Sequence, residues 1–131
     1  SGITNNLTFS LEDRVENIRR ASEVSKLFME NGSVVICSLV SPTKDIRKQA
    51  QEIIGEGFKE IFVNAPFDVC AERDVKGLYK KALAGEIKNF TGLDSPFEGS
   101  ENPFIELRTH EKDLETCKNE LVEIVLKEIQ L

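Results

Sequence analysis

Three short apolar runs, rich in β-branched side chains, alternate with helical patterns along the chain, and this alternation limits the folds open to it. The runs are VVICSL at 34–39, EIFV at 60–63 and FIEL at 104–107. The first is bounded by Gly32 and Pro42. Continuous apolar runs of this length favour strands that are buried on both faces of a parallel sheet. The sequence therefore predicts an α/β fold, in which helices cover a parallel sheet.

Helix signals fill the segments around these runs. Ser10 and Asp13 have the spacing of a capping box, and the helix that they open should run to about Asn31. Further helices are expected at about 43–54, at about 66–72 and at 113–129. A chain of 131 residues is large enough to bury a core, so we expect one domain over 1–131.

The composition argues against two classes of protein. The net charge is −6 at pH 7, which disfavours a nonspecific nucleic-acid binder, because such binding depends on neutralising phosphates. No apolar run approaches the roughly 20 residues that a membrane span needs, and no signal peptide is recognisable. We therefore expect neither a nucleic-acid partner nor a membrane partner.

The cysteines and the histidine give no sign of a metal site. Cys37, Cys70 and Cys117 are odd in number, widely spaced and set in apolar surroundings. This pattern favours buried, reduced thiols of a cytoplasmic protein over a disulfide framework. His110 has no cysteine or histidine near it in the sequence, so we expect it at the surface or in a loop.

Residues 74–98 (DVKGLYKKALAGEIKNFTGLDSPFE) combine basic residues, aromatic residues and glycines with little apolar periodicity. The glycines would act as hinges, and Phe90 lies in a turn, where an exposed ring could stack on a ligand. The lysines could also form an ordinary solvated face. The composition as a whole favours a lid that closes over an anionic ligand with a ring.

A second candidate cluster lies near the start of the chain. Arg14 and Asn17 are three residues apart, hence neighbours on one helix face, and they suit a pair of phosphate or sulfate oxygens. Phe9, just before the helix, could stack on a base. The alternative is a solvated helix face, with Phe9 as a hydrophobic staple.

Ser41 lies at the carboxyl end of the first expected strand, where open α/β sheets bind ligands. It has no histidine or acid beside it in the sequence, which argues against a nucleophilic role. A turn before Pro42 is the simpler explanation.

Four motifs, in this order, resemble adenylylsulfate kinases: FSLEDRVENIRR at 9–20, the Ser-Pro pair at 41–42, ERDVKGLYKKALAGEIKNFTGLDSPFE at 72–98 and ENP at 101–103. They cover nearly the whole chain, and the lid motif is highly specific. These enzymes use ATP and Mg²⁺ to phosphorylate the 3′-hydroxyl of adenosine 5′-phosphosulfate (APS), giving ADP and PAPS. The resemblance implies a P-loop-kinase-like fold, a parallel sheet flanked by helices, and a role in sulfate assimilation.

The resemblance also implies an APS site made from five residues. Phe9 and Phe90 would sandwich the adenine of APS. Arg14 and Asn17 would hold its phosphosulfate, and Lys88 would approach the same substrate from the lid.

For ATP, the resemblance implies that Arg73 stacks on the adenine and that Thr109 borders the same ring. Lys76 would lie near the phosphates. Ser41 matches a position that some members phosphorylate. No catalytic residue is assigned to this chain.

One part of the family pattern is missing from this sequence. Members begin with a strand and a phosphate loop, followed by a second strand with an Asp-Gly-Asp motif, and Ser1-Gly2 aligns just after that motif. No G-x-x-x-x-G-K-[ST] motif occurs in the chain. We therefore expect an N-terminally truncated domain, with the leading strand, the phosphate loop and the Mg²⁺ ligands outside it. Such a chain should not transfer phosphate alone.

Two other functions stay open at this stage. A non-catalytic module that senses APS or PAPS could keep Phe9, Arg14, Asn17 and Phe90. A kinase relative acting on another nucleotide, such as a cytidine diphosphoramidate, fits the two phenylalanines and the Arg/Asn pair less well. Under any of these functions, exposed sheet edges would favour a covering partner, and the family commonly forms homodimers.

Overall fold

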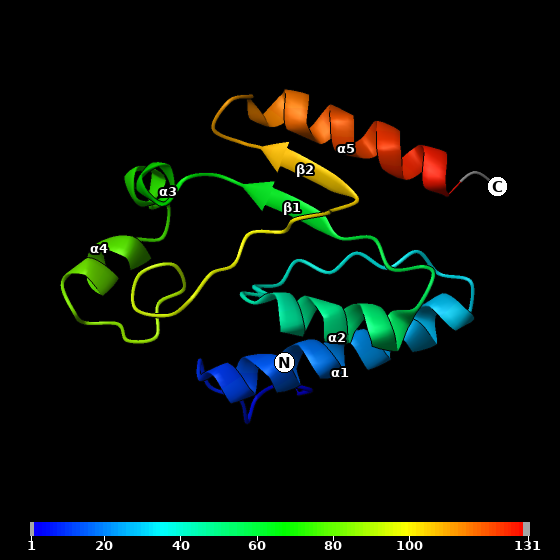
Figure 1. Ribbon diagram of the computed structural model, residues 1–131, viewed down its shortest axis with the longest axis horizontal. Coiled ribbons are helices and arrows are strands. Elements are labelled where there is room, and N and C mark those ends of the chain that lie inside the picture. Colours follow the sequence, from blue (N-terminus) through cyan, green and yellow to red (C-terminus); the bar gives the residue numbers. More distant parts are fainter. Residues whose placement is uncertain (1, 130–131) are drawn as a thin grey trace. The chain divides into compact units, whose positions relative to one another are not determined.

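The computed structural model describes residues 2–129 (Figure 1), and the chain divides into two compact units. The first unit contains the residues up to Phe58 together with Pro96–Glu98. The second contains Lys59–Ser95 and the chain from Gly99 onward. The first unit is helical, whereas the second holds a two-stranded sheet with its helices.

Helix α1 (Leu11–Glu30) begins at the predicted cap. The Ser10 side chain accepts a hydrogen bond from the Asp13 N–H at 3.2 Å. The Asp13 carboxylate, however, accepts from the Thr8 N–H at 2.8 Å and from the Thr8 hydroxyl. The acid of the motif thus secures the turn that leads into α1. The bond to Ser10 satisfies one of the N–H groups that a helix start leaves unpaired.

Helix α2 (Lys44–Ile54) packs against α1 and closes the core of the first unit. Thr43 caps α2, since its side chain accepts from the Ile46 N–H at 3.4 Å. Ile18 of α1 and Ile46 and Ala50 of α2 are buried together, with Val15 and Phe58 packed around them. Figure 1 shows the two helices side by side. The bounds that the sequence predicted for these two helices are confirmed.

The prediction of a strand at 34–39 is wrong. In the described chain these residues are extended but belong to no strand, and Ile36 is 83% exposed. Their β-branched side chains favour an extended backbone, but a strand also needs a neighbour for its hydrogen bonds. No described segment pairs with this run. Cys37 is exposed as well, which corrects the expectation of three buried thiols.

The second unit contains the predicted parallel pair of strands. Strand β1 (Ile61–Asn64) pairs in parallel with β2 (Ile105–Arg108), each one residue later than expected. Helix α5 (Leu114–Glu128) lies along β2, where Leu107 and Cys117 are buried (Figure 1). An α/β fold with a parallel sheet and flanking helices is therefore confirmed.

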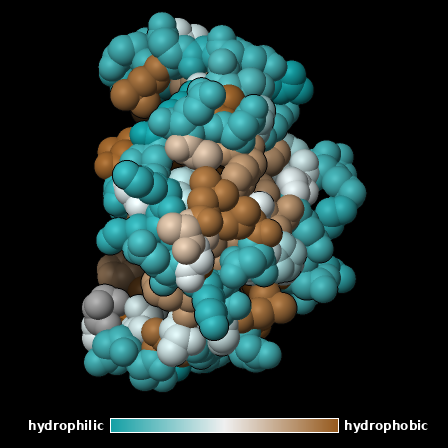
Figure 2. All heavy atoms as spheres, turned by 90° about the vertical axis from the view of Figure 1, so that its left-hand side faces the viewer, coloured by the Kyte–Doolittle hydropathy of each residue, from teal (hydrophilic) through white to brown (hydrophobic). Residues whose placement is uncertain are grey.

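The expectation that β1 is buried on both faces is wrong. Val63 and Ile61 are exposed, because among the described residues of this unit the helix packing falls on β2. Figure 2 shows brown apolar atoms among teal hydrophilic ones on one face of the molecule. Apolar side chains that reach the surface in this way are candidates for further contacts.

Two short helices complete the second unit. Helix α3 (Phe67–Arg73) follows β1, as expected. Helix α4 (Leu78–Leu83) lies inside the predicted lid, where the sequence showed too little periodicity to suggest a helix. Among the described residues, no helix is long and apolar enough to cross a membrane.

An ion-pair network on α1 holds the turn before it. The Glu16 carboxylate accepts from Arg19 Nε and from Arg20 Nε, each at 2.7 Å. Arg20 also donates to the carbonyl of Ile3 at 2.6 Å and to the side-chain oxygen of Asn6 at 2.8 Å. Hydrogen bonds from Arg19 first, and then from Arg20, lower the pKa of Glu16 from 4.5 to about 2.

We expect replacement of Ile46 by Ala to destabilise the first unit by about 2–4 kcal/mol, because it removes a side chain that is only 2% exposed and leaves a cavity. Leu27→Ala on α1, at a side chain that is 66% exposed, should cost about 0.5 kcal/mol or less. Chemical denaturation of the two variants checks this. Equal losses in both would contradict the assigned core.

We also expect Glu16 to contribute stability that depends on pH. Since its pKa is lowered from 4.5 to about 2 in the folded chain, the contribution is present above pH 4.5 and is lost as the pH falls towards 2. The free energy of unfolding of Glu16→Gln should therefore differ from wild type above pH 4.5 and converge with it near pH 2. The difference should shrink in high salt, because the pairs are partly exposed. A difference that persists at pH 2 would contradict the assignment.

Candidate functional site

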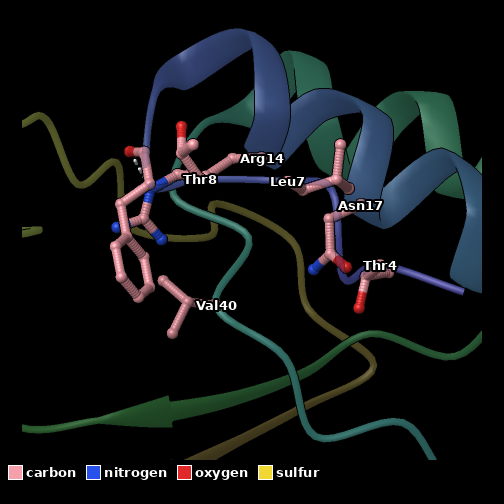
Figure 3. Close-up of a pocket in the computed structure, with 7 residues that line it drawn as sticks. Thr4, Leu7, Thr8, Arg14, Asn17 and Val40 are labelled. Carbon is pink, nitrogen blue, oxygen red and sulfur yellow. Dashed lines mark hydrogen bonds between the residues drawn. The ribbon is translucent and has the colours of Figure 1, made fainter. Parts of the chain in front are cut away.

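A pocket of about 270 Å³ in the first unit brings together three of the predicted site residues, Phe9, Arg14 and Asn17. The other residues that line it are Thr4, Leu7, Thr8 and Val40. Figure 3 shows Arg14 and Asn17 projecting from α1, with Thr4 beside Asn17 and Val40 on the facing segment. The helix spacing of three residues thus places both polar side chains at one pocket, as the sequence predicted.

Phe9 and Arg14 also contact each other directly. Arg14 Nε donates to the Phe9 carbonyl at 3.3 Å, and its guanidinium carbon lies 5.8 Å from the centre of the Phe9 ring. The ring itself is 72% exposed. The pocket therefore combines an accessible aromatic surface, a permanent positive charge and an amide, which suits a ligand with both a ring and an anionic group.

Ser41 and Pro42 are held from two directions within the first unit. Arg47, itself buried, donates to the Ser41 carbonyl at 2.9 Å. The Glu98 N–H donates to the Pro42 carbonyl at 2.7 Å, and the Glu98 carboxylate accepts from the Lys44 N–H at 2.7 Å. Glu98 thus ties the end of the predicted lid to the start of α2. No signal in the sequence connects two residues that are 54 positions apart.

Arg73 and Thr109, both predicted to border ATP, lie together in the second unit. Arg73 donates to the Thr109 side-chain oxygen at 3.1 Å and to the Thr109 carbonyl at 2.5 Å. The Thr109 N–H and side chain both reach the carbonyl of Asn64, at 2.9 and 3.3 Å. These bonds place the Arg73 guanidinium beside the carboxyl ends of β1 and β2, where ligands bind in parallel sheets.

The lid contains a small aromatic cluster, which corrects the expectation of exposed aromatic residues. Tyr79 on α4 lies 4.8 Å from Phe90 and 5.5 Å from Phe67 of α3, measured between ring centres. Both Tyr79 and Phe90 are half-buried. Burial raises the pKa of the Tyr79 phenol, and Cys70 and Asp74 act in the same direction. The ring partner of Phe90 comes from the lid itself.

Two carboxylates order the backbone of this cluster. Asp74 accepts from the N–H groups of Tyr79 and Lys80 at 3.0 and 2.9 Å, and these bonds help to lower its pKa. Asp94 accepts from the N–H groups of Asn89, at 2.9 Å, and Phe90. Sequence reasoning missed both acids as structural groups, although an acid just before a short helix is a recognisable cap.

The remaining predicted site residues are placed more simply. Lys76 lies in the turn between Asp74 and Gly77, and Lys88 precedes the Phe90 turn; both are exposed. Phe9 belongs to the first unit and Phe90 to the second. Within residues 2–129, no group of three or more His, Cys, Asp or Glu side chains could hold a metal ion. We assign no step of the reaction to a metal.

Comparison with known proteins now identifies the family. The model of the adenylylsulphate kinase family matches residues 1–108. The adenylyl-sulfate kinase of Bacteroides thetaiotaomicron is 53% identical over 131 residues, which are 99% of this chain and 65% of that protein. The probable adenylyl-sulfate kinase of Bacillus subtilis is 46% identical, over 98% of this chain and 66% of that protein. The chain thus spans about two thirds of the length of these curated relatives.

A solved structure agrees with this match. The Mycobacterium tuberculosis APS kinase CysC, in complex with AMPPNP and APS, superposes with a TM-score of 0.86 and is 38% identical. The similarity covers 95% of this chain and 73% of that one. Together with the family match over 1–108, this shows that the chain belongs to the adenylylsulphate kinase family.

Proposed function

We propose that the chain is the APS-binding and lid portion of an adenylylsulfate kinase, which transfers the γ-phosphate of ATP to the 3′-hydroxyl of APS and releases ADP and PAPS. The observation that carries the proposal is the pocket in which Phe9, Arg14 and Asn17 meet. The family resemblance implies APS contacts for these three residues. The related M. tuberculosis kinase was solved in complex with AMPPNP and APS, which supports the proposal that this chain binds APS and contributes contacts to ATP.

In this proposal the first unit recognises APS through two kinds of contact. The exposed Phe9 ring stacks on the adenine, while Arg14 and Asn17 donate hydrogen bonds to the phosphosulfate oxygens. A guanidinium suits this task because it stays charged and presents its N–H groups in a fork that matches a pair of anionic oxygens. A local positive group also matters because the chain as a whole carries a net charge of −6.

The second unit supplies the ATP contacts and the lid in the same proposal. Arg73 stacks on the adenine of ATP, with Thr109 at the edge of that ring and Lys76 near the phosphates. Phe90 and Lys88 approach APS from the lid. The Arg73–Thr109 hydrogen bonds support the ATP assignment, because they hold the guanidinium in one orientation.

These residues bind and orient, but phosphoryl transfer also requires charge neutralisation around the γ-phosphate. No phosphate-loop motif occurs among the 131 residues, and no acid in them is assigned to the 3′-hydroxyl. We therefore propose that this polypeptide by itself binds APS without converting it.

A non-catalytic sensor of APS or PAPS is the alternative, favoured by the same pocket. The homodimer, the single domain, the cytoplasmic location and the modification of Ser41 stay predictions.

We expect calorimetric titration of the chain with APS to show binding that Arg14→Gln weakens roughly 10- to 100-fold, because charge-assisted hydrogen bonds are lost. Lys26→Gln is the matched control, since it removes the same charge from an exposed position on the same helix and should leave the affinity unchanged. Absence of APS binding by the wild-type chain would overturn the proposed function. Tight PAPS binding together with weak APS binding would favour the sensor.

We further expect the 131-residue chain to form no PAPS when it is incubated with ATP, Mg²⁺ and APS. The B. thetaiotaomicron adenylyl-sulfate kinase, assayed in parallel by chromatography of the nucleotides, is the positive control. PAPS formation in proportion to the amount of chain would contradict the proposal that the polypeptide binds without converting.

A further inference from the structure

We propose that Tyr79 is a positioning residue for APS: its ring holds the Phe90 ring in place, so that Phe90 meets the adenine already oriented. This inference rests on the proposed function and extends it to a residue for which no ligand contact is implied. Tyr79 acts through Phe90 and touches no reacting atom.

The ring geometry is the first support. Tyr79 and Phe90 meet at an interplanar angle of 75°, with ring centres 4.8 Å apart, and this T-shaped arrangement is one that aromatic pairs prefer. The Phe67 ring also lies beside Tyr79, with ring centres 5.5 Å apart and an interplanar angle of 60°. A T-shaped neighbour covers at most one face of a ring, and Phe90 is only half-buried. Part of its surface thus stays accessible for stacking.

The backbone around both rings is held as well. The Asp74 carboxylate accepts from the Tyr79 N–H at 3.0 Å, and the Asp94 carboxylate accepts from the Phe90 N–H. The Phe90 carbonyl accepts from the N–H groups of residues 93, 94 and 95 at 3.1–3.2 Å. Each ring therefore extends from a backbone that is already hydrogen-bonded, and the ring contact removes the rotation that remains.

A contact between the Phe90 turn and Phe67 supports the same arrangement. Gly92 has a φ of +87°, and a Cβ atom there would lie 3.4 Å from the Phe67 ring. The turn thus lies in van der Waals contact with the cluster, and the positive φ of Gly92 disfavours a residue with a side chain there. An aromatic ring held in its bound orientation loses less entropy when a ligand stacks on it, so its affinity is higher.

The decisive experiment is a double-mutant cycle, read by calorimetric titration with APS. Tyr79→Leu should weaken binding about three- to tenfold, because it removes an aromatic contact. Tyr79→Phe keeps the ring and should stay close to wild type. In a Phe90→Ala background, Tyr79→Leu should have no further effect, since nothing is left to position. Leu83→Ala, on the same helix at a side chain 61% exposed, is the matched control.

Two outcomes of this cycle would overturn the inference. An unchanged affinity in Tyr79→Leu would show that Phe90 needs no support. An equal loss in the wild-type and Phe90→Ala backgrounds would show that Tyr79 acts on the fold in general, and not through Phe90.

A second measurement needs no ligand. Tyr79 is the one tyrosine of the chain and there is no tryptophan, so the tyrosine band in near-ultraviolet circular dichroism reports on Tyr79 alone. Phe90→Leu should change the intensity of this band, because one of the two rings beside Tyr79 is lost, whereas Leu83→Ala should preserve the band. A band that is the same in Phe90→Leu as in the wild-type chain would overturn the ring contact. A wild-type chain that does not bind APS would overturn the proposed function, and the band would still decide whether the two rings pack.

Discussion

Where a helix or turn begins, backbone N–H groups lack a partner in the chain. Side-chain oxygens accept from such groups in several segments of the proposed site. Ser10 and Asp13 secure the residues on both sides of Phe9, and Glu98 secures the start of α2 beside Pro42. Asp74 and Asp94 do the same for Tyr79 and Phe90. These bonds satisfy N–H groups that the local backbone leaves without a partner, so these short polar side chains favour turns at these positions.

The elements predicted correctly from the sequence are those whose signals are local. Helices α1 and α2 carry a capping residue and apolar positions at helical spacing, which one segment can express on its own. The run at 34–39 was predicted to be a strand on equally local grounds and forms none in the described chain, because strand formation depends on a neighbour. Helix α4 was missed because the acid that accepts from its first turn, Asp74, lies three residues before the N-cap residue Gly77, and the segment has little apolar periodicity.

The candidate site divides in the same way. Arg14 and Asn17 could be predicted to share a face, because three residues on a helix bring side chains together. The contacts of Arg47 with Ser41 and of Arg73 with Thr109 join residues whose proximity only the folded chain creates. The packing of Phe90 on Tyr79 is of this second kind. A pattern that identifies a family can therefore indicate which residues meet a ligand without indicating what holds them in position.

The cost of ordering explains why a lid that binds through one ring should be ordered before its ligand arrives. Fixing the backbone costs roughly 1–2 kcal/mol per residue, so ordering the seven residues 89–95 upon binding would cost about 7–14 kcal/mol. A base stacked on one aromatic side chain returns only about 1–3 kcal/mol. A disordered segment could not recover the difference through Phe90 and Lys88 alone. The hydrogen bonds of Asp94 and the contact with Tyr79 meet that cost during folding, which leaves the stacking energy of Phe90 available for affinity.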